Sequence, residues 1–216
     1  IRGYKAIDSY GVTPELHKGL LQAYYASVSY MDAQAGKVIR ALEKLGRKKD
    51  TIIVFSSDHG YLLGEHHKFQ KQHLFEESTR VPFILSVPWM KDTHGGRTKK
   101  ITELVDLYPT LAELAGLTPP SVLQGKSLVA LIDDPVSKAW KKKMAFTISR
   151  NGGESIRTDD WRYIHWGHGE KGQELYDLKN DPAEFKNLAG NPKYADHLIG
   201  LKAQLLAKRK VAGYRK

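Results

Sequence analysis

The sequence predicts an α/β domain followed by a small antiparallel sheet that a terminal helix closes. Apolar residues recur at steps of three and four across residues 14–45, which is the period of a helix with one buried face. Two short apolar runs, residues 51–56 and 81–87, have the composition of strands in an α/β sheet. In the last third of the sequence, short strand-like runs alternate with turns rich in Gly, Asn and Asp. We therefore expect residues 1–140 to form the α/β part and residues 141–216 the small sheet with its helix.

The long helix has a start signal and a stop signal. Thr13 is a suitable N-cap, and Pro14 suits the first helical position, where a backbone N–H is not needed. Gly46 follows the last apolar residue, where a left-handed residue is favoured. The apolar stripe predicts that one face of the helix is buried. It consists of Leu16, Leu20, Tyr24, Val28, Met31, Ala35, Val38, Leu42 and Leu45.

The two apolar runs predict strands of an α/β sheet. Residues 51–56 show no polar alternation, so we expect a central parallel strand that is covered on both faces. Residues 81–87 give the second strand, with Pro82 near its start, where proline is tolerated. Leucines within residues 101–115 then fit one face of a helix that Gly116 ends.

The end of the chain predicts an antiparallel meander and a closing helix. Its strand-like runs are residues 144–149, 154–157, 161–166 and 174–178. Trp161, Tyr163 and Trp166 are expected on one buried face of the third run, with His165 on the opposite face. Leucines within residues 198–206 predict a lysine-rich closing helix.

Composition narrows the classes of partner. The 216 residues carry a formal net charge of +10, which favours acidic partners such as sulfated or phosphorylated molecules, nucleic acid or anionic lipid. No stripe of aromatic residues interleaved with Arg is present and no apolar run is long enough to span a bilayer, so neither nucleic acid nor a membrane is expected. The absence of Cys excludes disulfides and thiolate metal sites within these residues. The sequence begins with Ile1 and not with an initiator Met, so we expect a fragment or a processed chain. The sequence indicates no cellular compartment.

An acidic residue and a histidine directly follow the first predicted strand. In an open α/β sheet, ligands bind at the carboxyl ends of strands, and Asp58 and His59 lie at such an end. The pair could bind a divalent cation, act as an acid–base pair or hydrogen-bond the neighbouring loop. Gly60 and Gly64 then allow sharp turns.

Side chains that can carry positive charge follow these turns. Lys71 and a histidine could neutralise an anion beside the cation, an arrangement that suits a sulfate or phosphate ester. His66 and His67 either line a substrate cleft or are ordinary exposed loop histidines. No nucleophile is evident among the residues.

Several stretches of the sequence resemble the sulfatases, and within them the iduronate-2-sulfatase-like group. The most specific runs from the first strand through Ser57-Asp58-His59-Gly60 to Lys71 and continues over residues 76–83. Further similar stretches are residues 24–32, 104–111, 123–128 and 174–184, so nearly the whole chain is covered.

The resemblance implies an alkaline-phosphatase-like α/β fold with helices on both faces of its sheet, a smaller carboxy-terminal sheet and a bound calcium ion. It assigns Asp58 and His59 as metal ligands and Lys71, thirteen positions after Asp58, as a sulfate contact. His59 stands where Asn is commoner in the family. Calcium usually prefers oxygen ligands, so another divalent metal is an alternative. The implied substrate is a sulfate ester, above all of a carbohydrate.

The family's nucleophile is a formylglycine made in a Cys/Ser-x-Pro-x-Arg motif, which the 216 residues lack. We therefore expect this motif, and further acidic metal ligands, in an amino-terminal part of the same protein. The chain alone is expected to be inactive. Two alternatives stay open: a phosphoesterase or phosphonate hydrolase of the same superfold, and a non-catalytic module that binds polyanions through charge.

Overall fold

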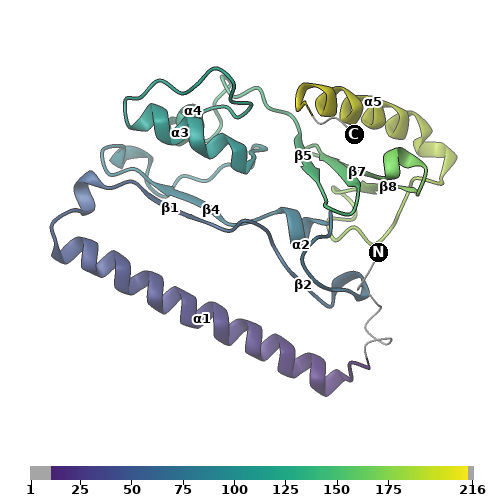
Figure 1. The fold of residues 1–216 in the computed structure, drawn as a ribbon, viewed down its shortest axis with the longest axis horizontal. Helices are drawn as coiled ribbons and strands as arrows, with labels where there is room; N and C mark the ends of the chain where they lie inside the picture. Colours follow the sequence, from purple (N-terminus) through teal and green to yellow (C-terminus); the bar gives the residue numbers. More distant parts are fainter. Residues whose placement is uncertain (1–10, 214–216) are drawn as a thin grey trace. The chain divides into compact units, whose positions relative to one another are not determined.

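The computed structural model describes residues 11–213 (Figure 1), so Ile1 and its neighbours lie outside the described residues. The chain divides into two compact units. The first comprises Ile1–Lys71 and Arg80–His94, and the second comprises Gln72–Thr79 and Gly95–Lys216. Within residues 11–213, no helix has both the length and the apolar character that crossing a membrane requires.

The first unit is built from one long helix and two pairs of short strands. Helix α1 (Pro14–Lys44) begins as predicted, because the Thr13 hydroxyl accepts a hydrogen bond of 3.2 Å from the Leu16 backbone N–H. Its other elements are η2 (Lys48–Asp50), β1 (Ile53–Ser56), β2 (Leu62–Leu63), η3 (Glu65–His67), β3 (Phe69–Gln70), β4 (Phe83–Ser86) and η4 (Lys91–Thr93).

The two predicted strands pair with each other antiparallel, so the expected parallel strand at residues 51–56 is wrong for this pair. Ile53 lies opposite Ser86, and Ser56 lies opposite Phe83. A parallel pair needs a crossover that carries the chain back to the starting end of the sheet, usually a helix. The connection here contains only the β2–β3 hairpin and the one-turn helix α2 (Glu76–Thr79) before the chain enters β4.

The apolar stripe of α1 is exposed, although its period predicted burial. No residue of α1 is buried within the described chain, and Leu20 and Val38 are 41% and 71% exposed. Strand β1 also leaves Phe55 exposed on one face. A helix in water gains most of its stability from packing its apolar face. The predicted burial of this face of α1 is therefore not found among the residues described.

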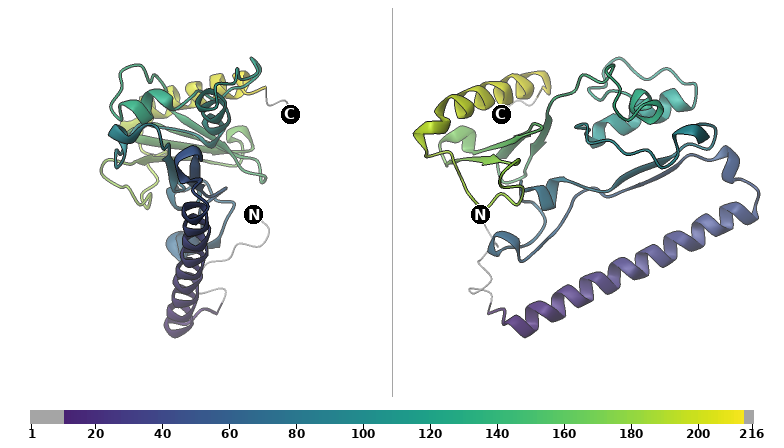
Figure 2. Two further views of the ribbon diagram at one scale, coloured as in Figure 1. Left: turned by 90° about the vertical axis from the view of Figure 1, so that its left-hand side faces the viewer. Right: turned by 180° about the vertical axis from the view of Figure 1, so that it is seen from behind.

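The second unit contains the predicted meander. Strands β5 (Ala145–Ile148), β6 (Gly153–Arg157), β7 (Trp161–Trp166) and β8 (Gln173–Asp177) form an antiparallel sheet in this order. Helix α5 (Ala195–Val211) lies along one face of it, which Figure 2 shows from two further directions. The remaining elements are η5 (Leu104–Asp106), α3 (Leu107–Leu114), α4 (Val129–Asp133), η6 (Gly167–Gly169) and η7 (Pro192–Tyr194).

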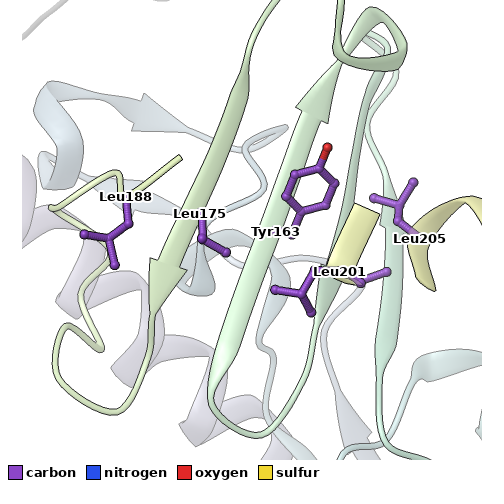
Figure 3. Packing of buried hydrophobic residues seen from close by; sticks show 6 residues of the cluster. Tyr163, Leu175, Leu188, Leu201 and Leu205 are labelled. Carbon is purple, nitrogen blue, oxygen red and sulfur yellow. The ribbon is translucent and has the colours of Figure 1, made fainter. Parts of the chain in front are cut away.

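The core of this unit lies between the sheet and α5. Tyr163 and Leu175 from the strands pack with Leu201 and Leu205 from the helix, and all four are almost fully buried (Figure 3). Trp166 instead packs on the other face with Leu74 and Ile164. The predicted common face of Trp161, Tyr163 and Trp166 is therefore wrong for Trp166. Because side chains alternate with period two, His165 shares the face of Tyr163 under α5, so the predicted opposite face for His165 is also wrong.

Residues 95–140 join the small sheet through buried polar contacts. The fully buried Asp106 carboxylate accepts hydrogen bonds from the Lys126 backbone N–H at 2.8 Å and from the Lys142 ammonium at 2.7 Å. Glu103 accepts from the same ammonium and from the Phe146 backbone N–H. The division into two compact units therefore groups residues 95–140 with the small sheet. The domain boundary after residue 140 stays a prediction.

Gly125 allows the close approach on which the Asp106 contacts depend. A Cβ atom at this position would lie 1.9 Å from the Val105 carbonyl oxygen, which belongs to backbone. We expect Gly125→Ala to lower the free energy of unfolding by about 3 kcal/mol, as overpacking against backbone does. Urea denaturation checks this. Gly200→Ala is the matched control, because nothing lies within 4 Å of its Cβ position in α5; it should be neutral or stabilising. Equal stability of the two variants would contradict the prediction.

Candidate functional site

Asp58 and His59 occupy the turn that directly follows β1, as the sequence predicts. The Ser57 hydroxyl donates a hydrogen bond of 2.8 Å to the His59 carbonyl, and the Asp58 carboxylate accepts one of 3.0 Å from the His59 backbone N–H. These local bonds fix the turn. The Asp58 side chain is 85% exposed and the His59 side chain 37% exposed, so both are accessible to a ligand.

The imidazole of His59 is oriented by its own turn. Its Nδ1 lies 2.9 Å from the Gly60 carbonyl oxygen. A carbonyl can only accept, so Nδ1 carries the proton and Nε2 presents its lone pair. A hydrogen bond from one ring nitrogen to a carbonyl is typical of histidines that bind a metal through the other.

The two side chains fit a divalent cation. Nε2 of His59 lies 3.6 Å from Oδ2 of Asp58, a spacing that lets one ion contact both atoms. No group of three or more potential metal ligands among residues 11–213 includes either residue. Asp58 and His59 are therefore a partial ligand set that needs further donors.

Lys71 comes near this turn through the β2–β3 hairpin. Leu62 pairs with Gln70 and Leu63 with Phe69, so Lys71 follows at the open end of the hairpin, one position beyond Gln70 and across from Tyr61. The hairpin therefore brings Lys71 back toward the segment that follows His59. The Lys71 side chain is exposed.

His66 and His67 lie at the tip of the same hairpin, the end away from Lys71. Both have a φ of 54°, in the left-handed region, and Gly64 before them has a φ of 130°. The Glu65 carboxylate stabilises this tip by accepting a hydrogen bond of 2.6 Å from the Leu63 backbone N–H. Left-handed backbone at residues other than Gly is concentrated at functional sites. The substrate-binding role of both histidines stays a prediction.

Helix α1 supports the hairpin through contacts that the sequence did not indicate. Nε2 of His17 lies 2.6 Å from the Leu63 carbonyl oxygen, and its ring meets that of Phe69 edge-on at 5.6 Å. Tyr24 lies against Tyr61, with ring centroids 5.6 Å apart. The helix thus positions the strands that lead to Lys71.

A second cluster of polar residues, in the second unit, was also missed. Glu154, His165 and His168 bring one ligand-type atom each within 4.8 Å of one another. The period-two alternation of Tyr163 and His165 along β7 was the signal that could have placed His165 on the covered face.

Comparisons with known proteins agree with the fold. The profile of the family described as "Sulfatase" matches residues 4–117, and that of "N-sulphoglucosamine sulphohydrolase, C-terminal" matches residues 64–211. A sulfatase of Formosa agariphila is 36% identical over 188 residues, covering 87% of this chain and 36% of that protein. The N-acetylglucosamine-6-O-sulfatase of Bacteroides thetaiotaomicron is 34% identical, covering 81% of this chain and 33% of that protein.

Solved structures extend the similarity to three dimensions. A protein solved with its substrate D-glucosamine-2-N,6-O-disulfate matches with a TM-score of 0.75 and 31% identity, covering 87% of this chain and 40% of that one. The phosphonate monoester hydrolase of Agrobacterium radiobacter matches with a TM-score of 0.82 and 28% identity, covering 92% and 43%.

These matches confirm the predicted alkaline-phosphatase-like α/β fold with a small antiparallel sheet and a carboxy-terminal helix. The chain spans about a third of the length of the curated relatives it matches. The two family profiles together match residues 4–211. The chain therefore belongs to the sulfatase family.

Proposed function

We propose that this chain is the part of a sulfuric ester hydrolase that supplies Asp58 and His59 as metal ligands and Lys71 as a sulfate contact. The observation that carries the proposal is the oriented imidazole of His59, whose Nε2 lies 3.6 Å from the Asp58 carboxylate at the end of β1. Membership of the sulfatase family supports the same assignment.

Each residue has a distinct part in this chemistry. Asp58 and His59 would hold a divalent cation, which polarises the ester oxygens when it is bound. Calcium is the ion that the family resemblance favours, and the imidazole ligand leaves room for another divalent metal. Lys71 neutralises negative charge on the sulfuryl oxygens, where charge stabilisation counts most in the transition state.

We infer a sulfated carbohydrate of the glycosaminoglycan type as substrate. A similar protein is named N-acetylglucosamine-6-O-sulfatase, and a similar structure holds a glucosamine disulfate. The net charge of +10 suits a polyanionic substrate. Assignment to the iduronate-2-sulfatase-like group rests on the resemblance, which includes His59 in place of the commoner Asn.

An amino-terminal part of the same protein is the partner we propose for the exposed stripe of α1. The stripe has helical period yet none of its residues is buried in the described chain, so it is suited to pack against further sheet. That part would also contribute the formylglycine nucleophile and the missing metal ligands. The 216-residue chain by itself would then be inactive.

One observation favours a second candidate reaction. The phosphonate monoester hydrolase of Agrobacterium radiobacter has a high TM-score among the similar structures, 0.82, and a metal beside an oxyanion serves both reactions. Lys71 and the family profile favour sulfate. A non-catalytic polyanion-binding module would rest on charge alone, and its binding to heparin would survive Lys71→Ala but disappear at high salt.

Matched esters of one phenol test the proposal. We expect the full-length protein to hydrolyse the aryl sulfate with a kcat/KM at least about 100-fold above those for the phosphate monoester and the phosphonate, a difference of about 2.7 kcal/mol in transition-state binding. The 216-residue chain assayed alone should show only the background rate. A preference for the phosphonate would make the phosphonate hydrolase the correct assignment. Turnover by the chain alone would contradict the need for an upstream nucleophile.

A further inference from the structure

The cluster under the carboxy-terminal end of α5 joins four elements of the second unit. Glu154 on β6 is 2% exposed, and its Oε2 lies 2.6 Å from Nε2 of His165 on β7. Arg209, in the last turn of α5, forms an ion pair of 3.2 Å with Oε1 of the same carboxylate. The guanidinium also contacts Nδ1 of His168 in η6 at 2.8 Å.

The contact between Arg209 and His168 fixes the protonation state of this imidazole. A guanidinium has five N–H donors and no acceptor, so Nδ1 of His168 must accept. The ring can accept at Nδ1 only when that nitrogen carries no proton. Protonated His168 would lose the hydrogen bond and place a second cation against Arg209.

His165 requires the same neutral state for a different reason. Its Nε2 donates to Glu154, and its buried Nδ1 has no hydrogen-bond partner within residues 11–213. Protonation would leave a buried N–H donor unsatisfied, which is unfavourable. The contacts of both imidazoles in the closed cluster are therefore those that neutral rings satisfy.

The charges around His168 also oppose protonation. Besides Arg209, α5 contributes Lys202, whose Nζ lies 3.7 Å from the Cβ position of Gly169. The Lys171 side chain lies 3.0 Å from the Cβ position of Gly167. The carboxylate of Glu154 lies among these groups and forms an ion pair with Arg209.

The neighbouring tyrosine does not add charge, and the backbone around His168 is constrained. Tyr163 contacts the His165 ring and donates its hydroxyl to Gln173, and burial raises its pKa to about 12. His168 has a φ of 61°, between two glycines with positive φ, so a constrained turn presents it to α5.

We propose that Glu154, His165, His168 and Arg209 form an acid-sensitive latch that holds the carboxy-terminal turns of α5 on the sheet at neutral pH and releases them when His168 is protonated. The hydrogen bond from Arg209 needs an unprotonated Nδ1 on His168, so a proton on this nitrogen breaks the contact that holds the last turn of α5.

Hydrogen exchange of the 216-residue chain tests the latch. Protection factors, each taken relative to unstructured peptide at the same pH, should fall about tenfold or more for the amides of residues 206–211 between pH 7.5 and pH 5.0. Amides of β7 should keep their protection, because the hydrophobic core under Leu201 and Leu205 stays closed.

Two variants separate the latch from general acid sensitivity. His168→Gln keeps a side-chain oxygen that accepts from Arg209 but cannot titrate, so it should remove most of the pH dependence at residues 206–211. Arg209→Ala should show at pH 7.5 the low protection that the wild type reaches at pH 5.0. His197→Gln is the matched control, because His197 is an exposed histidine of α5 that stacks on Trp161 at 4.6 Å, outside the cluster.

Several outcomes would overturn the proposal. The first is equal protection of residues 206–211 at both pH values in the wild type. The second is full retention of the pH dependence in His168→Gln, or an equal loss of protection in β7. The third is a rise in protection with zinc at pH 7.5 that His168→Gln abolishes, because the cluster would then be a metal site.

Discussion

Replacing Asp58 with Ala in the full-length protein is expected to lower kcat/KM for a sulfate ester by about 10³-fold, or about 4 kcal/mol of transition-state stabilisation. The reason is loss of a carboxylate from the proposed metal site, where Nε2 of His59 lies 3.6 Å from Oδ2 of Asp58. An aryl sulfatase assay at saturating metal measures the change. The same substitution should abolish the metal-dependent rise in melting temperature, because a bound ion stabilises the native state by mass action.

Controls separate metal binding from folding and from the reaction class. Asp92→Ala, which alters another exposed aspartate of the first unit, should keep both the activity and the metal-dependent rise. Lys71→Ala should lower activity yet retain the metal-dependent rise, since Lys71 is assigned to sulfate and not to the ion. A metal-dependent rise that persists in Asp58→Ala would show that Asp58 is not a ligand, whatever the reaction.

Removing the carboxylate of Glu184 is expected to lower the free energy of unfolding by about 3 kcal/mol, because it removes one of the two carboxylates that pair with a buried guanidinium. The Arg162 side chain is 1% exposed and donates hydrogen bonds to Glu184, to Glu76 and to the Ser155 hydroxyl. Glu184 also accepts a hydrogen bond of 2.7 Å from the Glu76 backbone N–H at the start of α2. Urea denaturation of Glu184→Ala measures the loss. Glu113→Ala, on an exposed face of α3, should change stability by less than about 0.5 kcal/mol.

The pH dependence of this buried group has a defined sign. Burial raises the pKa of Glu184, and this effect exceeds the opposing attraction of Arg162. The folded state therefore holds the proton more tightly than the unfolded state, and stability falls as pH rises from the unfolded pKa through the folded one. Glu184→Gln should remove this fall and be less destabilising than Glu184→Ala, because the amide keeps an acceptor for Arg162. A steeper fall in Glu184→Gln than in the wild type would contradict the assignment.

Local patterns predicted the elements that carry the site. The cap at Thr13, the period of α1 and the apolar run of β1 each depend on residues close in sequence, and the structure has all three. The position of Asp58 and His59 after β1 followed from the end of that run. The orientation of the His59 ring did not, since it depends on a hydrogen bond within a turn whose backbone the sequence does not specify.

Pairings between distant residues were beyond local reasoning. The hairpin that brings Lys71 toward Tyr61 turns through two histidines in left-handed backbone. Residue type does not predict this conformation at histidine. The strand direction of β1 and β4 was predicted wrongly for a related reason. Period and composition describe which faces of a strand are apolar, not which way its partner runs.

The sequence by itself therefore determined the long helix α1, the closing helix α5, the strands of the small sheet, the family and the candidates Asp58, His59 and Lys71. Periodicity, caps and motifs each depend on residues that are close in the sequence. Only the tertiary structure decided which atoms face each other. It oriented Nε2 of His59 toward Asp58, and it placed His165 and Arg209 in one buried cluster although they come from β7 and α5. The reason is that desolvation and hydrogen bonding act between chain segments that folding brings together, and their partners have no fixed spacing in the sequence.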